Sequence, residues 1–118
     1  MELLTAELRQ QLPRLYAQEG AADPIVHIKF FTPDSSWTWY ATEGSLVDRN
    51  GRAIELDSVT TPANAVDFLF FGYVIGQEKE WGYFALSELE SASGPLGLPI
   101  ERDLYFEPKP FSEVAARH

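Results

Sequence analysis

The sequence predicts an α+β fold, in which an antiparallel sheet of about four to five strands carries an N-terminal helical segment and short C-terminal helices. Near the N-terminus, leucines recur at positions 4, 8, 12 and 15, which is the spacing of one helix face. Downstream, runs of aromatic and β-branched residues are separated by turn residues, as in a meander of strands. With 118 residues, of which 45% are hydrophobic, we expect a single domain, residues 1–118, with its own core.

The first element is predicted to be an amphipathic helix over residues 5–18. Thr5 is a suitable N-cap, and Gly20 is a suitable terminator. Pro13 cannot donate a hydrogen bond to the preceding turn, so we expect a kink, or two short helices that meet, near Leu12.

Residues 25–42 are predicted to form a β-hairpin, with strands at 25–31 and 37–42. A turn centred on Asp34 fixes the register, and a slip of one residue would exchange the two faces. The pairs expected from this register are Phe31 with Trp37, Lys29 with Trp39 and His27 with Ala41.

Further strands are expected at 67–75, apolar on both faces as in a central strand, and at 80–86. Pairing Ile75 with Glu80 sets Gly72 against Tyr83 and Tyr73 against Gly82, so that each ring covers a glycine. Asn50-Gly51 is a turn sequence that could join 46–47 to 54–56 in a small hairpin.

The C-terminal third is predicted to be mostly short elements. Ser87 and Glu90 have the spacing of a capping box, which predicts a helix from Ser87. An edge strand is expected at 103–106 and a last helical turn at 111–116.

Composition excludes several classes of function. The chain has no Cys, which rules out thiolate nucleophiles, disulfides and thiolate metal sites. It has neither a signal-peptide pattern nor about 18 consecutive apolar residues, so we expect a cytoplasmic protein without a membrane partner. The formal net charge of −9 disfavours direct binding of nucleic acid, although such a surface could also imitate nucleic acid in a basic groove of another protein.

Several segments together resemble a known family. They are Lys29-Phe-Phe-Thr-Pro-Asp34, Trp37-Thr-Trp-Tyr40, Asp67-Phe-Leu-Phe-Phe-Gly72, Gly82-Tyr-Phe84 and Leu98-Pro-Ile-Glu-Arg-Asp-Leu-Tyr105. The chain thus looks like the domain of unknown function 2958, a family of short bacterial proteins found on plasmids, phages and integrated elements. The resemblance implies a cytoplasmic bacterial protein in a mobile-element setting and supplies no catalytic residues. It also raises the expectation of a counter-defence or plasmid-maintenance role.

The predicted first hairpin offers a candidate binding patch, in which Lys29 contacts the tryptophans by a cation–π interaction of roughly 0.5 to 2 kcal/mol. The alternative is that the N-terminal helix covers this face and the patch belongs to the core. The residues of the patch are His27, Lys29, Phe31, Trp37 and Trp39.

Carboxylates form a second candidate surface, made of Glu88, Glu90, Glu101 and Asp103. In an extended segment Glu101 and Asp103 point to one side and could hold Mg²⁺ or share a proton, but solvated charges or a salt bridge through Arg102 explain them better. His27 is the one histidine within the body of the chain that could serve as a base, and a structural role suits it better.

We therefore expect a non-enzymatic, protein-binding accessory factor of a bacterial mobile element, without metal or cofactor. In its counter-defence form, the acidic surface blocks a nucleic-acid-binding partner. The alternative is a small-ligand or metal-dependent enzyme that uses Glu101 and Asp103. Both a monomer and a homodimer are compatible with the sequence.

Overall fold

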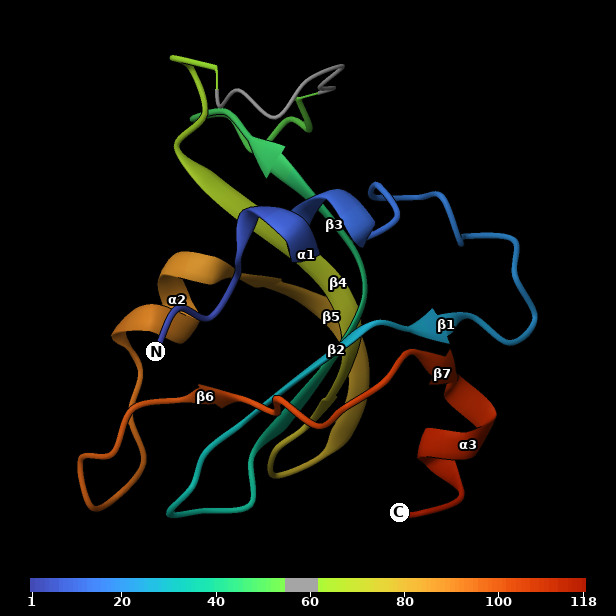
Figure 1. Ribbon diagram of the computed structural model, residues 1–118, viewed down its shortest axis with the longest axis vertical. Helices are drawn as coiled ribbons and strands as arrows, with labels where there is room; N and C mark the ends of the chain where they lie inside the picture. The colour runs from blue at the N-terminus through green and yellow to red at the C-terminus, as the bar shows by residue number, and fades with distance from the viewer. Residues whose placement is uncertain (55–61) are drawn as a thin grey trace.

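The computed structural model describes residues 1–54 and 62–118 and confirms the α+β fold. A five-stranded antiparallel sheet has the order β5-β4-β3-β2-β6, and β1 pairs with β7 in a separate two-stranded sheet (Figure 1). The strands are β1 Ile25–Val26, β2 Ile28–Phe31, β3 Thr38–Val47, β4 Asp67–Ile75, β5 Lys79–Ala85, β6 Glu101–Arg102 and β7 Lys109–Pro110. The helices are α1 Ala6–Gln11, α2 Leu86–Ser91 and α3 Phe111–Ala115. In the described part of the chain, no helix has the length and apolar character needed to cross a membrane.

The N-terminal helix is shorter than predicted. Thr5 caps α1 as expected, because its Oγ1 accepts the N–H of Leu8 at 3.2 Å. The helix ends at Gln11 and Leu12 is extended, since Pro13 disfavours helical backbone in the residue before it. The prediction of helix up to residue 18 was therefore wrong, and the chain continues through turns across one end of β3.

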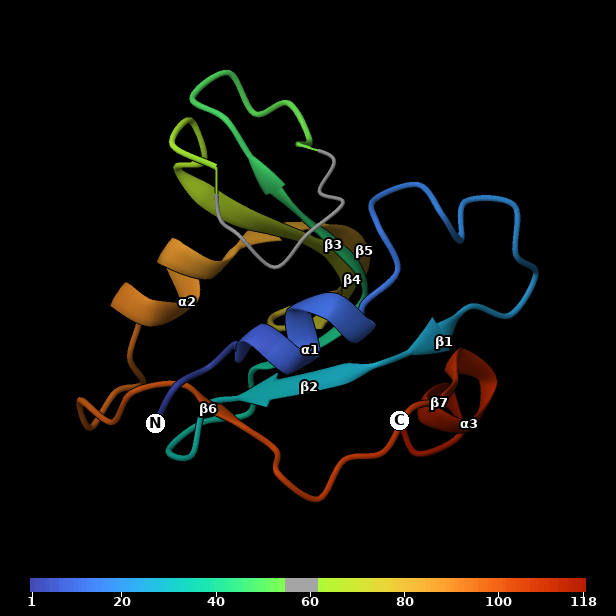
Figure 2. The ribbon, with the colours of Figure 1, turned by 45° about the horizontal axis from the view of Figure 1, so that its top comes forward.

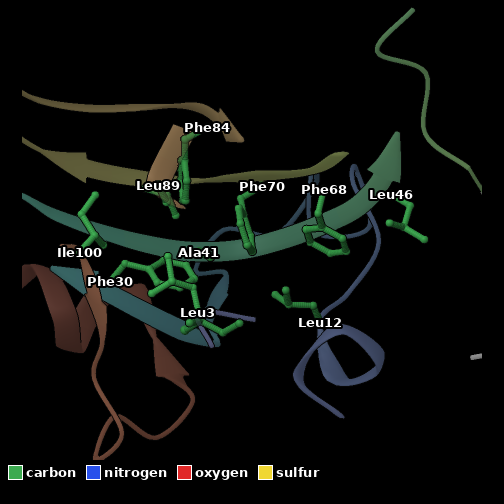
Figure 3. Close-up of a cluster of buried hydrophobic side chains, with 11 residues drawn as sticks. Leu3, Leu12, Phe30, Ala41, Leu46, Phe68, Phe70, Phe84, Leu89 and Ile100 are labelled. Atoms are coloured by element: carbon green, nitrogen blue, oxygen red, sulfur yellow. The ribbon is translucent and has the colours of Figure 1, made fainter. Parts of the chain in front are cut away.

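The larger core lies on the sheet face that α1 and α2 cover (Figures 2 and 3). Phe30 and Phe70 are fully buried at its centre, with ring centroids 5.4 Å apart. Figure 3 shows the sheet residues gathered against Leu3 and Leu12 from the N-terminal segment. Leu89 of α2 and Ile100 complete this cluster.

A smaller core lies on the opposite face of the sheet. Tyr40 alternates with Trp39 and Ala41 along β3, so its side chain faces away from the larger core. It packs with Val26 of β1 and Val114 of α3. Figure 1 shows α3 next to β7, close to the C-terminus. Asp23 anchors α3 there, since its carboxylate accepts both the N–H and the hydroxyl of Ser112, at 2.9 and 2.6 Å.

The first hairpin has a register one residue away from the prediction. Lys29 pairs with Tyr40, and Phe30 pairs with Trp39. The turn covers residues 33–36 and is closed by a hydrogen bond from Thr32 N to Trp37 O at 3.0 Å. A turn of four residues has its centre between Asp34 and Ser35, and not at Asp34 as predicted. The observed register lets the fully buried Phe30 share the core face with its partner strand.

The second hairpin is also shifted by one residue. Ile75 pairs with Lys79, so the loop is 76–78, and Gly72 lies opposite Gly82 instead of an aromatic residue. The aromatic residues consequently pair with each other across β4 and β5, as Tyr73 with Trp81 and Phe71 with Tyr83.

The smaller predicted elements differ in position. The cap of α2 is formed by Glu88, whose Oε1 accepts the N–H of Ala85 at 3.0 Å, whereas Ser87 donates to Asp67. The edge strand is β6 at Glu101–Arg102 and not 103–106. The turn at Asn50-Gly51 is present and Val47 bridges Ala53, while residues 55–56 of the predicted hairpin lie outside the described residues.

Candidate functional site

A β-bulge in β3 redirects one carboxylate to the face opposite the larger core. The register between β3 and β4 shifts between Ala41 and Glu43, so Thr42 is an extra residue, and its hydroxyl donates to Phe71 O at 3.0 Å. Without the bulge, Glu43 would follow Ala41 onto the core face. With it, Glu43 lies opposite Phe71 on the other face, while Leu46 still reaches the core.

The carboxylate of Glu43 is buried, with 4% of the residue exposed, and it is held by backbone donors. Its Oε1 accepts the N–H of Tyr16 at 2.9 Å, and its Oε2 accepts the N–H of Gln18 at 2.6 Å. Tyr16 adopts φ 73°, a left-handed conformation that is unfavourable for a bulky residue. The segment after α1 is thus bent to present two N–H groups to one carboxylate.

Gln18 fixes the same segment to β1 and β3. Its side-chain amide donates to Ile25 O at 3.0 Å and to Thr42 O at 2.8 Å, and its carbonyl accepts the N–H of Ile25 at 2.7 Å. These bonds satisfy backbone groups at the first residue of β1 and at the bulge of β3.

These elements enclose a cleft of about 420 Å³, which we call the aromatic cleft. Trp81 forms its floor with Phe71 and Phe111, at ring-centroid distances of 5.9 and 4.7 Å. Tyr83 lies 5.0 Å from Phe71, and it is 52% exposed. The complete lining is Tyr16, Gln18, Glu19, Ala21, Ala22, Pro24, Thr42, Glu43, Phe71, Trp81, Tyr83 and Phe111.

The aromatic cleft is electrostatically negative. Its described lining includes the carboxylates of Glu19 and Glu43 and no Lys, Arg or His. The pKa of Tyr83 is raised, first by a hydrogen bond with Tyr16, then by partial burial and by the negative charges of Glu43 and Glu19 among other interactions. A negative field at an aromatic surface is the environment that attracts a cation.

The predicted patch around Lys29 is divided by the observed register. Lys29 and Phe31 lie on the face of Tyr40, where the Lys29 ammonium is 5.9 Å from the Tyr40 ring, whereas Trp39 packs against the larger core. Trp37 stacks on Trp39 at 5.8 Å and is 40% exposed. His27 lines a different cavity, of about 280 Å³, between α1 and residues 102–106, and burial lowers its pKa.

The predicted acidic surface has mixed roles. Glu88 caps α2, and Glu90 is exposed on the same helix. Glu101 is half-buried opposite Phe31, while Asp103 lies 3.7 Å from the Lys29 ammonium and accepts the N–H of Tyr105 at 2.9 Å. Within residues 1–54 and 62–118, no three acidic or imidazole side chains are grouped as metal ligands would be.

Sequence reasoning missed the aromatic cleft. The alternation of Phe71 with Tyr73 and of Trp81 with Tyr83 was visible and could have indicated an aromatic face. Glu43 gave no such signal, since it followed the predicted strand at 37–42 and regular alternation does not reveal a bulge.

Residues 46–117 match the family described as "Protein of unknown function (DUF2958)". The chain belongs to this family. The matched residues include β4, β5 and α3, which supply the aromatic floor of the cleft, whereas Tyr16, Gln18 and Glu43 precede them. No curated protein and no solved structure matches the chain. The DUF2958 match confirms the resemblance seen in the sequence, and the comparisons assign no activity.

Proposed function

We propose that this DUF2958 protein is a non-enzymatic binding module that captures a basic segment of a partner protein in the aromatic cleft. The observation that carries the proposal is the buried Glu43 carboxylate beside exposed aromatic rings, in a lining without basic residues. Both carboxylate oxygens already accept backbone N–H groups, so Glu43 is a fixed part of the wall and not a group poised for proton transfer.

The rings favour a Lys or Arg side chain as the bound group. Trp81 and Tyr83 are 40% and 52% exposed, and each can contribute about 0.5 to 2 kcal/mol through a cation–π contact. Tyr and Trp at the centre of a concave surface are also typical of the residues that dominate protein interfaces. The net charge of −9 supports the same partner class, because it attracts a basic surface over a longer range.

The proposal extends to the biological setting. Nucleic-acid-binding proteins expose Lys and Arg where they contact phosphates, so they are a partner class with the required segments. An accessory factor of a mobile element that covers the nucleic-acid-binding surface of a host defence protein would act in counter-defence. The acidic composition supports this extension. The enzymatic alternative has less support, since the Asp103 carboxylate already accepts the N–H of Tyr105 at 2.9 Å.

The test uses peptides of about ten residues that differ only in charge, rich in Arg, Gln or Glu, with binding followed by heteronuclear NMR at about 0.15 M salt. We expect the Arg peptide to shift the signals of Trp81 and Tyr83, and the Gln and Glu peptides to leave them unchanged. Trp81→Ala should weaken binding about tenfold. Trp37→Ala is the matched control, because Trp37 is also 40% exposed but lies outside the cleft.

Two outcomes would refute the proposal. One is equal binding of the Arg and Gln peptides, which would remove the role of charge. The other is equal loss of binding in Trp81→Ala and Trp37→Ala, which would place the peptide elsewhere.

A further inference from the structure

We propose that a second site, on the same sheet face but at the end of β2 and α3, binds a phosphate group. It is a cavity of about 230 Å³, which we call the basic pocket. Its lining residues are Lys29, Tyr40, Asp103, Tyr105, Phe106, Lys109, Val114, Arg117 and His118. This site shares no lining residue with the aromatic cleft.

Basic side chains are few in this chain, but several converge at the basic pocket. The chain has nine Lys and Arg residues against eighteen Asp and Glu, and the basic residues are scattered along the sequence. The fold nevertheless brings Lys29, Lys109 and Arg117 to one cavity, from β2, from β7 and from the segment after α3. Lys79, the remaining lysine of the sequence, donates to the backbone carbonyl of His118 at 2.9 Å.

One acidic side chain stands against these three cations in the described lining. That residue is Asp103, and its 3.7 Å contact with the Lys29 ammonium is long and partly exposed, so it contributes little. Lys109 lies 4.9 Å above the Phe106 ring, which leaves its N–H donors available to an acceptor in the pocket. Clustered cations of this kind repel one another, and a bound anion would relieve that repulsion.

The positive charges of nearby Lys and Arg residues also affect two polar groups at the pocket, Tyr40 and His118. The Tyr40 hydroxyl lies 2.8 Å from the His118 Nε2 atom. The pKa of His118 is lowered by burial and then by the positive charges of Lys79 and Lys29. Burial raises the pKa of Tyr40, the positive charge of Arg117 lowers it, and the negative charge of Asp103 raises it. The pocket therefore places a hydroxyl group beside fixed positive charge, which suits an oxyanion.

The small volume of the pocket and its Lys and Arg donors suit a phosphate group. The pocket is smaller than the usual binding site of a drug-sized ligand, so it suits a small anion or the terminal group of a larger compound. Arginine and lysine are the residues that bind phosphate oxygens, by charge-assisted hydrogen bonds. Tyr105 and Phe106 add an aromatic rim that could contact the organic part of a phosphate ester.

The experiment titrates the protein with inorganic phosphate and, separately, with phenyl phosphate, up to about 20 mM and at constant ionic strength set with chloride. Backbone and side-chain NMR signals of Lys29, Tyr40 and Lys109 report binding. We expect saturable shifts at these residues. Tighter binding of phenyl phosphate would assign the site to phosphate esters, and equal binding would assign it to free phosphate.

Variants test the location of the site. Arg117→Gln and Lys109→Gln should each weaken phosphate binding roughly tenfold, since each removes one charge-assisted contact. Arg49→Gln changes the net charge equally at an exposed residue outside the pocket, and should alter affinity less than about twofold. Tyr40→Phe is a second, conservative variant in case a charge change perturbs folding, and it should weaken binding by removing only the hydroxyl.

Absence of saturable shifts up to the highest phosphate concentration would overturn the proposal. Equal weakening by Arg49→Gln and Arg117→Gln would also overturn it, since binding would then follow net charge alone. Trp81→Ala must leave phosphate binding intact, so the outcome here does not depend on the peptide-binding test of the aromatic cleft.

Discussion

The Oε1 atom of Glu43 accepts the backbone N–H of Tyr16 at 2.9 Å, across 27 positions of the chain. This bond, with its counterpart at Gln18, joins the N-terminal segment to the central strand of the sheet. The same contact closes one wall of the aromatic cleft. Stability and the shape of the candidate site therefore depend on one buried side chain.

Replacing Glu43 with Ala should reduce the free energy of unfolding by about 3 kcal/mol, because two partly buried N–H groups lose their acceptor. Glu43→Gln should have an intermediate effect, since the amide keeps one acceptor but turns an NH₂ group toward the other N–H. Urea denaturation measures both. Glu19→Ala, at an exposed residue of the same cleft, is the control and should change stability by less than about 0.5 kcal/mol. Equal stability of Glu43→Ala and Glu19→Ala would contradict this account.

The backbone of Tyr16 gives a second prediction. At φ 73° a Cβ atom is unfavourable, so Tyr16→Gly should be more stable than Tyr16→Ala by about 1 kcal/mol. Both variants lose the Tyr16 ring and its hydrogen bond with Tyr83, so the difference between them isolates the backbone conformation. Thermal and urea unfolding of the pair measure it. An alanine variant as stable as the glycine variant would mean that this turn is not left-handed in solution.

The sequence allowed the four longest strands, β2 to β5, to be located, but not their registers. The apolar run at 67–75 corresponds residue for residue to β4, because aromatic and β-branched side chains favour a central strand. Each hairpin register was wrong by one residue, since turns of adjacent lengths leave similar sequence patterns. That slip moved Lys29 away from Trp39 and toward Tyr40.

The two candidate sites were beyond sequence reasoning for a related cause. The aromatic cleft depends on the bulge at Thr42, which no local sequence motif indicates. The basic pocket depends on contacts between β2, β7 and residues after α3, which lie far apart in the chain. Spacing along a sequence predicts the faces of single elements, whereas these sites arise from how distant elements pack.

The observed register makes Gly72 and Gly82 opposite neighbours with different surroundings, which gives a third prediction. An alanine Cβ at Gly72 would overlap the Tyr40 carbonyl oxygen, whereas at Gly82 it would meet no atom within 4 Å. Gly72→Ala should therefore destabilise the protein by about 3 kcal/mol, because backbone must move. Gly82→Ala should change stability by less than about 1 kcal/mol. Denaturant unfolding of both variants checks this. Under the rejected register the two substitutions would have similar effects, since each glycine would face an aromatic ring.

The two histidines give the last prediction, which concerns pH. Burial lowers the pKa of His27, and burial with the charges of Lys79 and Lys29 lowers that of His118, both from 6.5. Just below pH 6.5 the unfolded chain therefore binds more protons at these histidines than the folded chain does. The contribution of the neutral histidines to the free energy of unfolding is thus fully present above pH 6.5 and is lost as the pH falls toward their folded pKa values. NMR titration of the imidazole C–H signals should show both midpoints below 6.5. His118→Gln should reduce the loss of thermal stability between about pH 7 and pH 5. Midpoints above 6.5 would contradict the burial of His27 and the positive field at His118.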